Sequence, residues 1–420
     1  MNWAMQSSYK RLGNYIQEVN IRNTSLQDYP LLGVSIQKKF IPSIANTVGT
    51  DFTKYKIVKK NQFTYIPDTS RRGDKIGIAM LENEDYGLVS QAYTVFEVID
   101  EKKLLPEYLM MWFRRPEYDR YARYKSHGSV REIFDWAEMC DTLMPIPSPE
   151  KQLEIVREYN VIQNRIALNN QLITKLEETA QAIYKQWFVD FEFPDENGKP
   201  YKSNGGEMVW CEELEKEIPE GWYYGCLGDL SSQFSGFSFK GEEYSFEEGI
   251  TVVRGENVTE KRLRWDTHKK WNLKLDSRMK KCFLEADDIV IGMDGSKVGK
   301  NWALISKYEL PLLLAQRVTS VRANNKIESI YILISMMVLK FEEHVSQVQT
   351  GTSVPHISGQ QISDFPLLIP NNEILVSFHK KVKILYDKIN LNIQMSKKLD
   401  EMKDLLLAKM VKVEIEKELV

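Results

Sequence analysis

The chain has 420 residues, of which 43% are hydrophobic and 27% charged, and its formal net charge is −3. This composition predicts a soluble globular protein with two or three domains, each with its own core. No apolar run is long enough to span a membrane, and the N-terminal residues lack the apolar core of a signal peptide. The four cysteines lie far apart with no CxxC pair, which argues against a zinc site or a disulfide framework and favours a cytoplasmic protein.

Positive charge is concentrated in three segments, although the whole chain is weakly acidic. Residues 36–75 carry nine Lys or Arg against three Asp, and residues 254–281 carry ten Lys or Arg against four acids, a local surplus of +6 in each. Residues 114–131 carry six basic residues against two acidic ones. Such segments are most often solvated surface, and the alternative is two electropositive faces that bind nucleic acid.

In chain order, the residues before about position 147 mix two kinds of periodicity. Residues 93–99 (YTVFEVI) alternate apolar and polar side chains, which predicts a strand, and residues 107–124 are amphipathic, which predicts a helix. The same patterns return as a strand at 288–294 (DDIVIGM) and a helix at 328–346. The chain therefore contains two α+β parts, and residues 191–208, polar and rich in Gly and Pro, are predicted to form a linker after the first.

Each globular part is followed by a long helix with the apolar spacing of a coiled coil. Steps of four and three residues alternate to form an a/d seam of almost five heptads, and each helix would be about 60 Å long. A stripe this narrow requires one partner helix, and two equivalent helices related by a two-fold axis across their length pair antiparallel. The first seam is Ile155, Tyr159, Ile162, Ile166, Asn169, Ile173, Leu176, Ala180, Ile183 and Trp187, and the second is Phe378, Val382, Leu385, Ile389, Asn392, Ser396, Leu399, Lys403, Leu406 and Met410.

The chain matches itself at an offset of 223 residues. Upstream of the long helices the match is looser, and LVSQAYTV (88–95) resembles LLAQRVTS (313–320) at an offset of 225. Gln91 and Gln316 coincide in that match, and we expect a structural role for them. The chain is therefore two copies of one plan, a variable globular part followed by a long helix. In the helices Ile166, Leu168, Asn169, Gln171, Lys175, Leu176 and Glu178 meet identical residues 223 positions later.

Two asparagines interrupt the apolar seams at the centres of the helices. Asn169 lies near the midpoint of residues 150–187, and Asn392 lies near the midpoint of residues 373–410. In an antiparallel pair related by a pseudo-two-fold axis, central residues meet near that axis. We therefore predict that the two side-chain amides face each other and specify the register of the helices, at a cost in stability.

The sequence contains no recognisable catalytic or cofactor-binding motif. GMDGSKVGK (292–300) superficially resembles a phosphate loop, but Asp294 occupies the place of its first glycine and Asn301 that of the Ser or Thr that binds magnesium. There is no GxGxxG after a strand, and no Asn/Asp-Pro-Pro-aromatic tetrapeptide of the amino-methyltransferases. His127 and His356 have no Cys or carboxylate at metal-ligand spacing, so we expect no catalytic residue and no metal site.

A set of motifs resembles the specificity subunit of type I restriction-modification systems. QWFVDFEFPDENG (186–198) is followed by IPEGW (218–222) and LGDL (227–230), and the TGTS-to-LLIP segment (350–370) and the 223-residue repeat complete the pattern. The resemblance covers essentially the whole chain, and this combination is far more specific than one short motif. The family often has Glu-Gln soon after the Ile-Pro segment, where this chain has Lys151-Gln152 in the first copy and Ile374-Leu375 in the second.

The resemblance implies an α+β fold in which two similar mixed α/β target-recognition domains are joined by two long antiparallel coiled-coil helices in a pseudo-two-fold internal repeat. Each domain would read one half of a split, asymmetric site in double-stranded DNA. Two methyltransferase subunits would dock on the chain, and restriction subunits would join through them. The chain itself would be non-catalytic and bind no cofactor, with S-adenosylmethionine, ATP and Mg on the partner subunits. The expected divisions are the first recognition domain (1–147), the first spacer helix (148–192), a linker (193–217), the second recognition domain (218–370) and the second spacer helix (371–420).

We predict that DNA is contacted by the basic segments and by the small-residue loops before each long helix. Lys and Arg would hold phosphates, and Arg, Lys, Asn and Gln would read bases. For any single residue, an exposed charge without a DNA role is an equally good interpretation. The candidates are Lys38, Lys39, Arg71, Arg72, Lys75, Ser126, His127, Ser129 and Arg131 in the first domain, and Arg254, Asn257, Lys261, Arg262, Arg264, Lys297, Lys300, Thr352, Ser353 and His356 in the second.

Two other classes of function compete with this interpretation. An orphan, architectural or anti-restriction protein would use the same coiled coil to bind DNA without methyltransferase partners, and co-purification of a methyltransferase would separate the two hypotheses. A self-sufficient nuclease or methyltransferase would have to act without the motifs named above, and methyl transfer by the purified chain alone would support it.

Overall fold

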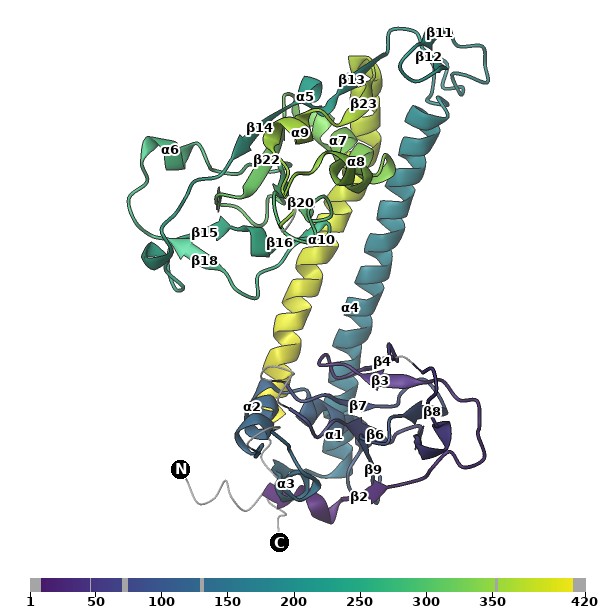
Figure 1. Ribbon diagram of the computed structural model, residues 1–420, viewed down its shortest axis with the longest axis vertical. Helices are drawn as coiled ribbons and strands as arrows, with labels where there is room; N and C mark the ends of the chain where they lie inside the picture. The colour runs from purple at the N-terminus through teal and green to yellow at the C-terminus, as the bar shows by residue number, and fades with distance from the viewer. Residues whose placement is uncertain (1–8, 46, 70–74, 129–131, 352–353, 411–420) are drawn as a thin grey trace. The chain divides into compact units, whose positions relative to one another are not determined.

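The computed structural model describes residues 9–45, 47–69, 75–128, 132–351 and 354–410. The chain forms two compact units: the first runs to Leu168 and takes up the chain again from Ser396, and the second is Asn169–Met395. Both divisions fall inside the long helices, so each unit contains one globular part and a portion of each helix (Figure 1). No helix in the described residues is long and apolar enough to cross a membrane.

The first unit is built on a four-stranded antiparallel sheet in the order β2-β9-β6-β7. Three two-stranded pairs, β1-β10, β3-β4 and β5-β8, surround this sheet. The strands are β1 (Tyr9–Arg11), β2 (Ile16–Val19), β3 (Leu32–Val34), β4 (Phe40–Pro42), β5 (Lys56–Lys59), β6 (Phe63–Tyr65), β7 (Ile78–Met80), β8 (Tyr86–Val89), β9 (Thr94–Val98) and β10 (Leu143–Pro145), and the short helices are α1 (Pro106–Phe113), α2 (Pro116–Tyr124) and α3 (Trp136–Asp141).

The second unit repeats this plan with a four-stranded antiparallel sheet in the order β14-β22-β19-β20. It also has a β18-β15-β21 sheet and the pairs β11-β12, β13-β23 and β16-β17. The strands are β11 (Met208–Cys211), β12 (Lys216–Pro219), β13 (Tyr223–Cys226), β14 (Ser231–Ser235), β15 (Ile250–Val253), β16 (Val258–Thr259), β17 (Arg262–Leu263), β18 (Lys269–Trp271), β19 (Ile289–Gly292), β20 (Trp302–Leu304), β21 (Leu312–Leu314), β22 (Val318–Ala323) and β23 (Pro366–Ile369). The short helices are α5 (Leu227–Leu230), α6 (Ser277–Lys280), α7 (Ser329–Val338), α8 (Phe341–Val348) and α9 (Gly359–Ser363).

The two sheets confirm that the sequence repeat is a structural repeat. β2, β9, β6 and β7 of the first unit correspond in order and direction to β14, β22, β19 and β20 of the second. In both units a further antiparallel pair, β1-β10 or β13-β23, joins the start of the globular part to the residues that lead into a long helix. The fold is therefore α+β with an internal repeat, as the sequence predicts.

Each predicted amphipathic helix is two shorter helices in the structure. In the first unit the break falls between α1 and α2, where Pro116 begins the second helix and its missing N–H prevents continuation of the first. In the second unit it falls between α7 and α8, where Lys340 has a left-handed backbone (φ 56°). Periodicity alone missed both breaks because the apolar pattern continues across them.

The two long helices are α4 (Pro149–Tyr184, 36 residues) and α10 (Asn372–Lys409, 38 residues). Every predicted seam residue is buried or half-buried, which confirms the a/d pattern. In the first unit Ile155 and Tyr159, near the start of α4, share a core with Leu407 near the end of α10. In the second unit the Trp187 ring, just past the end of α4, lies 5.7 Å from the Phe378 ring near the start of α10. This pairing of starts with ends is that of antiparallel helices.

The segment predicted as a linker is folded onto the second unit. After α4 a π-helical turn (Lys185–Val189) leads into a stretch in which Phe191 and Phe193 are buried. The Phe193 ring stacks on the Trp222 ring with centroids 5.3 Å apart. Burial of these aromatic side chains holds the segment against the second unit. Its stabilising effect outweighs the polar residues and glycines on which the prediction of a linker was based.

The two copies fasten their long helices to the globular parts by different side chains. Gln152 is fully buried: its carbonyl oxygen accepts the N–H of Leu105 (2.8 Å), and its amide donates to the carbonyls of Lys103 (2.8 Å) and Pro147 (2.9 Å). The residue at the position of the family's Glu-Gln is therefore a structural clamp at the start of α1. The matching residue of the second copy, Leu375, is buried in the apolar core.

In the second copy a histidine one helical turn further on makes the corresponding connection. His379 Nδ1 donates to the carbonyl of Ile327 (3.1 Å), two residues before α7 begins. Burial lowers the pKa of His379, so the neutral ring is favoured. The Lys151-Gln152 and Ile374-Leu375 difference therefore reflects two ways of building the same joint.

The two central asparagines lie on the buried sides of their helices. Asn169 is 2% exposed and Asn392 is 8% exposed. The amide of Asn392 donates to the carbonyl of Lys388 (2.8 Å), one turn back on its own helix. The facing of the two amides stays a prediction.

Candidate nucleic-acid interface

In the first unit, two segments far apart in the sequence form one paired loop at an end of the sheet. The described parts of the β6–β7 connection (66–69 and 75–77) and residues 126–128 and 132–134 are joined by hydrogen bonds from Phe134 N to Pro67 O (2.9 Å) and from Thr69 N to Glu132 O (2.9 Å). The Thr69 hydroxyl also lies 2.9 Å from the hydroxyl of Ser126. We call this arrangement the first loop pair.

The second unit contains an equivalent arrangement, the second loop pair. It joins the β19–β20 connection (293–301) to residues 350–351 and 354–357 through Gly295 N to Pro355 O (3.1 Å) and Ile357 N to Met293 O (2.9 Å). The backbone of His356 forms isolated β-bridges with Asp294 and with Thr350. In the first unit the backbone of Ile133 forms the same bridges with Asp68 and with His127. The two loop pairs therefore have corresponding β-bridges.

The local capping chemistry explains why both loop pairs end in the same way. Asp135 caps α3 by accepting the N–H of Glu138, and Ser358, 223 residues later, caps α9 by accepting the N–H of Gln361. A short polar side chain at this position satisfies an otherwise unpaired N–H of the helix. The loop ends at the capped helix in each unit. The chain then continues into β10 before α4, or into β23 before α10.

Most of the described candidates near the loop pairs are exposed. Lys75 and His127 are exposed in the first unit, and Lys297, Lys300 and His356 are exposed in the second. Lys297 lies 3.2 Å from Glu260, and Lys300 lies 3.7 Å from Glu342. Exposed ion pairs of this kind contribute little to stability, so a phosphate can replace the carboxylate at small cost. A hollow of about 310 Å³ beside Lys300 is lined by residues of the second loop pair and of α8.

The basic β16–β17 hairpin lies next to the second loop pair. Glu260 lies in the turn of this hairpin, and its backbone forms isolated β-bridges with Asn301 and Trp302 at the start of β20. Lys261 and Arg262 are exposed, and Lys261 has a left-handed backbone (φ 63°). Burial raises the pKa of Glu177 on α4, and the positive charges of Arg262 and Lys261 oppose that rise. The hairpin is therefore close enough to α4, within the same unit, for these charges to act on Glu177.

The structure places two of the predicted DNA contacts in the interior, so the prediction is wrong for Lys38 and Asn257. Lys38 is 5% exposed, and its ammonium group lies 2.6 Å from the Asp119 carboxylate. Asn257 is fully buried, and its amide donates to the carbonyls of Arg264 and Thr267 (both 3.0 Å). Local charge and polarity do not distinguish a surface residue from one that satisfies buried polar groups.

The other candidates are exposed, half-buried or outside the described residues. Lys39 is exposed and Ser126 is half-buried in the first unit, and Arg264 is exposed in the second, where it pairs with Asp266 (3.4 Å). Arg254 is half-buried, pairs with Glu256 and lies 5.8 Å from the Tyr244 ring, so most of its contacts are internal. Arg71, Arg72, Ser129, Arg131, Thr352 and Ser353 lie outside the described residues.

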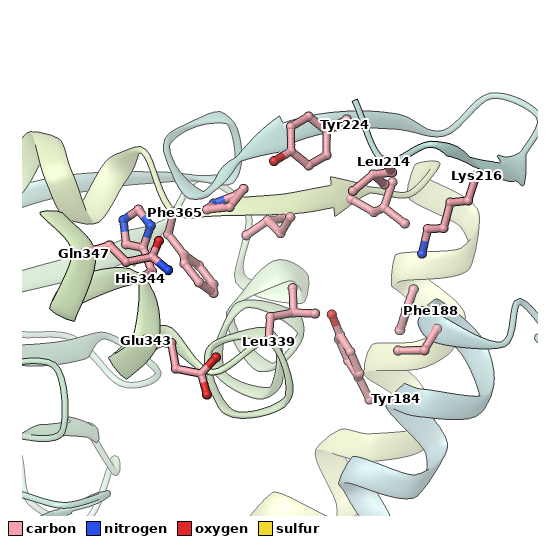
Figure 2. Close-up of a pocket in the computed structure, with 14 residues that line it drawn as sticks. Tyr184, Phe188, Leu214, Lys216, Tyr224, Leu339, Glu343, His344, Gln347 and Phe365 are labelled. Carbon is pink, nitrogen blue, oxygen red and sulfur yellow. The ribbon is translucent and has the colours of Figure 1, made fainter. Parts of the chain in front are cut away.

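The second unit also contains a largely apolar cavity between the end of α4, Leu339 after α7, α8 and β23 (Figure 2). Two of its polar side chains, those of Tyr184 and His344, make structural contacts. The Tyr184 hydroxyl lies 2.9 Å from the hydroxyl of Ser335, and burial raises the pKa of Tyr184 to about 12. His344 Nε2 donates to the carbonyl of Gln361 (2.9 Å). In the described lining of this cavity, none of these contacts pairs a nucleophile with a base, and no group of three or more metal-ligating side chains occurs within the described parts of the chain.

Comparison with known proteins assigns the family. A family model for the type I restriction modification DNA specificity domain matches residues 15–178 and 219–403. The chain belongs to this specificity family. Like its relatives, this type I specificity subunit serves the recognition of DNA sequence.

Individual relatives span most of the chain. The MjaIX specificity subunit from Methanocaldococcus jannaschii is 26% identical over 315 residues, which is 75% of this chain and 70% of that protein. The HindI specificity subunit from Haemophilus influenzae is 22% identical over 436 residues, covering 91% and 93% of the two chains. The crystal structure of a type I S subunit from M. genitalium superposes with a TM-score of 0.53 and 14% identity over 96% of this specificity subunit and 95% of that chain, a likeness of fold.

Two exposed residues beside the sheet ends were not among the predicted DNA contacts. Gln91 and Gln316 occupy corresponding turns before β9 and β22, and both are exposed. The sequence match pairs them at an offset of 225, and a structural role is expected for them from the sequence. Their exposure is a property of the tertiary structure of the specificity subunit, and a pairwise match cannot show it.

Proposed function

We propose that this chain recognises an asymmetric, bipartite DNA site, with each unit reading one half-site. The observation that carries this proposal is the duplicated loop pair, which presents exposed basic and polar side chains at the same end of the same sheet in both units. Loops held by a packed scaffold are the usual carriers of binding residues. The two loop pairs differ in sequence, so the two half-sites differ.

The charge distribution supports a division of labour within each unit. Exposed lysines such as Lys75 and Lys297 would hold phosphates and fix the orientation of the unit on the duplex. Uncharged polar side chains and the exposed His127 and His356 would contact base edges in the grooves. Salt dependence of DNA binding is therefore expected to report on the first group, and sequence preference on the second.

An exposed apolar stripe in each unit supports the docking of two methyltransferase subunits. In the first unit it lies on α4, where Val161 is 69% exposed, and in the second it lies on α10, where Ile384, 223 residues later, is 60% exposed. Leu153 and Leu168 on α4 match Val376 and Leu391 on α10 at the same offset, and all four are exposed. Exposed apolar stripes of this kind mark protein interaction sites.

Two equivalent stripes suit two copies of one partner. Restriction subunits would join through the methyltransferases, and the chain would catalyse nothing itself. It would bind no cofactor, with S-adenosylmethionine, ATP and Mg on its partners.

The docking surfaces can be tested one at a time. Val161→Lys and Ile384→Lys place a charge on one stripe each, and each variant is expected to reduce the methyltransferase content of the purified complex from two copies to one, as measured by native mass spectrometry. Asn160→Lys is the matched control, because Asn160 is also exposed on α4 and the added charge is the same. Retention of two methyltransferases in both stripe variants would contradict the proposed surfaces.

We also propose that Asn169 and Asn392 specify the register of α4 and α10. Both are buried at the centres of largely apolar seams, where an asparagine costs stability unless its amide is satisfied. A slip of one heptad would displace one helix along the other by about 10 Å, a distance of roughly three base pairs. A register held by these residues would therefore fix the length of the spacer between the half-sites.

The DNA proposal is tested by selection of binding sites. The full chain, purified with its methyltransferase, is mixed with a DNA library containing two random blocks separated by a variable spacer. Enrichment of two different short sequences at one fixed spacing is the expected result. Binding without a bipartite preference would overturn the proposal and favour the alternative, an orphan, architectural or anti-restriction protein that binds DNA without methyltransferase partners.

A further inference from the structure

Two glutamines occupy the same turn in the two units and are exposed in both. Gln91 lies between β8 and β9, and Gln316 lies between β21 and β22. In the first unit the start of β9 pairs with the end of β6 (Thr94 with Tyr65), and in the second the start of β22 pairs with the end of β19 (Val318 with Gly292). Each glutamine therefore lies at the end of the sheet that carries the loop pair.

The backbone around Gln316 is held on two sides. The N–H of Gln316 donates to the carbonyl of Phe237 (2.8 Å). The backbone at Gly236 lies so close to Ala315 that a Cβ at Gly236 would be 2.3 Å from the carbonyl oxygen of Ala315. On the other side Arg317 O accepts the N–H of Met293 (3.0 Å), at the base of the second loop pair. This turn is fixed before any ligand binds.

The turn that carries Gln91 is also held by contacts with its own unit. The N–H of Tyr93 donates to the carbonyl of Ser90 (3.0 Å), which closes the turn. The carbonyl of Tyr93 in turn accepts a hydrogen bond from the buried ammonium group of Lys56 (2.8 Å). Both glutamines are thus presented on an ordered backbone, so little conformational entropy of the main chain is lost on binding.

The glutamine side chains have no role inside the fold. Neither Gln91 nor Gln316 makes a side-chain hydrogen bond to any described residue, whereas buried glutamines such as Gln152 are fully paired. The neighbouring residue is Ala92 in one copy and Arg317 in the other. The two copies have the same glutamine and a different neighbour, and an exposed glutamine without a partner in the described parts of its unit is free to contact another molecule.

We propose that Gln91 and Gln316 each read one base, an adenine, at corresponding places in the two half-sites. This inference rests on the proposed DNA recognition. A glutamine amide both donates and accepts, and this pair of groups matches N7 and the N6 amino group of adenine in the major groove. A phosphate would be better served by a cation, and Arg317, paired with Asp294 (3.3 Å), provides one beside Gln316.

The test compares site selection by the full chain with its methyltransferase and by two single variants, Gln91→Ala and Gln316→Ala. Each variant is expected to lose preference for adenine at one position of one half-site, by roughly 5- to 150-fold, and to leave the other half-site unchanged. Each variant is therefore the control for the other. Gln37→Ala, at an exposed turn glutamine between β3 and β4, is a further control and is expected to leave the selected sequence unchanged.

A charge-changing variant separates base reading from a general effect on affinity. Gln316→Glu replaces the amide donor by an acceptor, which is expected to disfavour adenine and to favour cytosine, whose N4 amino group is a donor, at the same position.

Three results would overturn the assignment of the glutamines: unchanged sequence preference in both alanine variants, an equal loss of binding to all sequences, or relaxation at a base other than adenine. If the unsubstituted complex itself shows no bipartite preference, the proposed function fails before the glutamines are tested.

Discussion

Two adjacent lysines, Lys38 and Lys39 in the β3–β4 turn, have opposite environments and provide a direct test of the structural reasoning. Lys38 is buried and pairs with Asp119 (2.6 Å), and it also donates to the carbonyl of Phe113. Burial lowers the pKa of Lys38, and the Asp119 carboxylate opposes that shift. Lys39 is exposed. The same substitution at the two positions should therefore have different effects.

Lys38→Met removes the cation and leaves the Asp119 carboxylate buried, with the N–H of Ile76 (3.1 Å) as its remaining donor among the described residues. Removing one partner of a buried pair costs about 3–5 kcal/mol, whereas Lys39→Met is expected to change the free energy of unfolding by less than about 0.5 kcal/mol. Adding Asp119→Leu to Lys38→Met is expected to recover most of the loss, because neither charge then remains buried.

Urea unfolding of the full chain measures these differences in the free energy of unfolding. Hydrogen exchange of amides in the β3–β4 turn and α2 shows whether the loss is local to Lys38 and Asp119. DNA binding at several salt concentrations provides the second measurement. If Lys39 contacts a phosphate, Lys39→Met lowers the slope of log K against log salt by about 0.9, and Lys38→Met leaves it unchanged. Equal stability of the two single variants, or a lower salt slope for Lys38→Met, would refute the assignment of Lys38 to the interior.

Three further predictions concern the long helices. Gln152→Ala is expected to reduce the free energy of unfolding by roughly 2–5 kcal/mol, since three backbone groups, one in a buried and two in part-buried hydrogen bonds, lose their partner; a change below about 0.5 kcal/mol in urea unfolding would disprove the clamp. Because burial lowers the pKa of His379, the unfolded chain takes up a proton before the folded chain does as the pH falls. Stability present above pH ~6.5 should therefore be lost below it by up to about 1.4 kcal/mol per pH unit, and His379→Gln, which keeps a donor for Ile327, should flatten this dependence between pH 7.5 and 5.5. Replacing Asn169 and Asn392 together by Leu is expected to preserve or raise stability and to add DNA sites whose spacer differs by roughly three base pairs; an unchanged single spacer would count against a role in register.

Much of the architecture can be predicted from the sequence, because it depends on periodicities that are local in the chain. The heptad pattern predicts α4 and α10 and the residues of their seams, since an apolar stripe has one stable orientation on a helix. The match at an offset of 223 predicts two copies of one fold. The proline at position 116 is a local signal for the first break, although periodicity alone overlooks it. The break at Lys340 is harder to predict, because the apolar pattern on either side is uninterrupted.

The candidate site depends on contacts between distant segments, and these are decided only in the tertiary structure. Residues 66–69 lie about 60 positions before residues 126–128 and 132–134, and no local pattern indicates that they meet to form the first loop pair. The sequence by itself determined the repeat, the long helices and the kinds of side chain available for DNA. The tertiary structure decided which of them face solvent: it buried Lys38 against Asp119, left Lys39 outside, and exposed Gln91 and Gln316. The physical reason is that burial depends on which distant groups can satisfy a polar side chain, and neighbours in the chain do not carry that information.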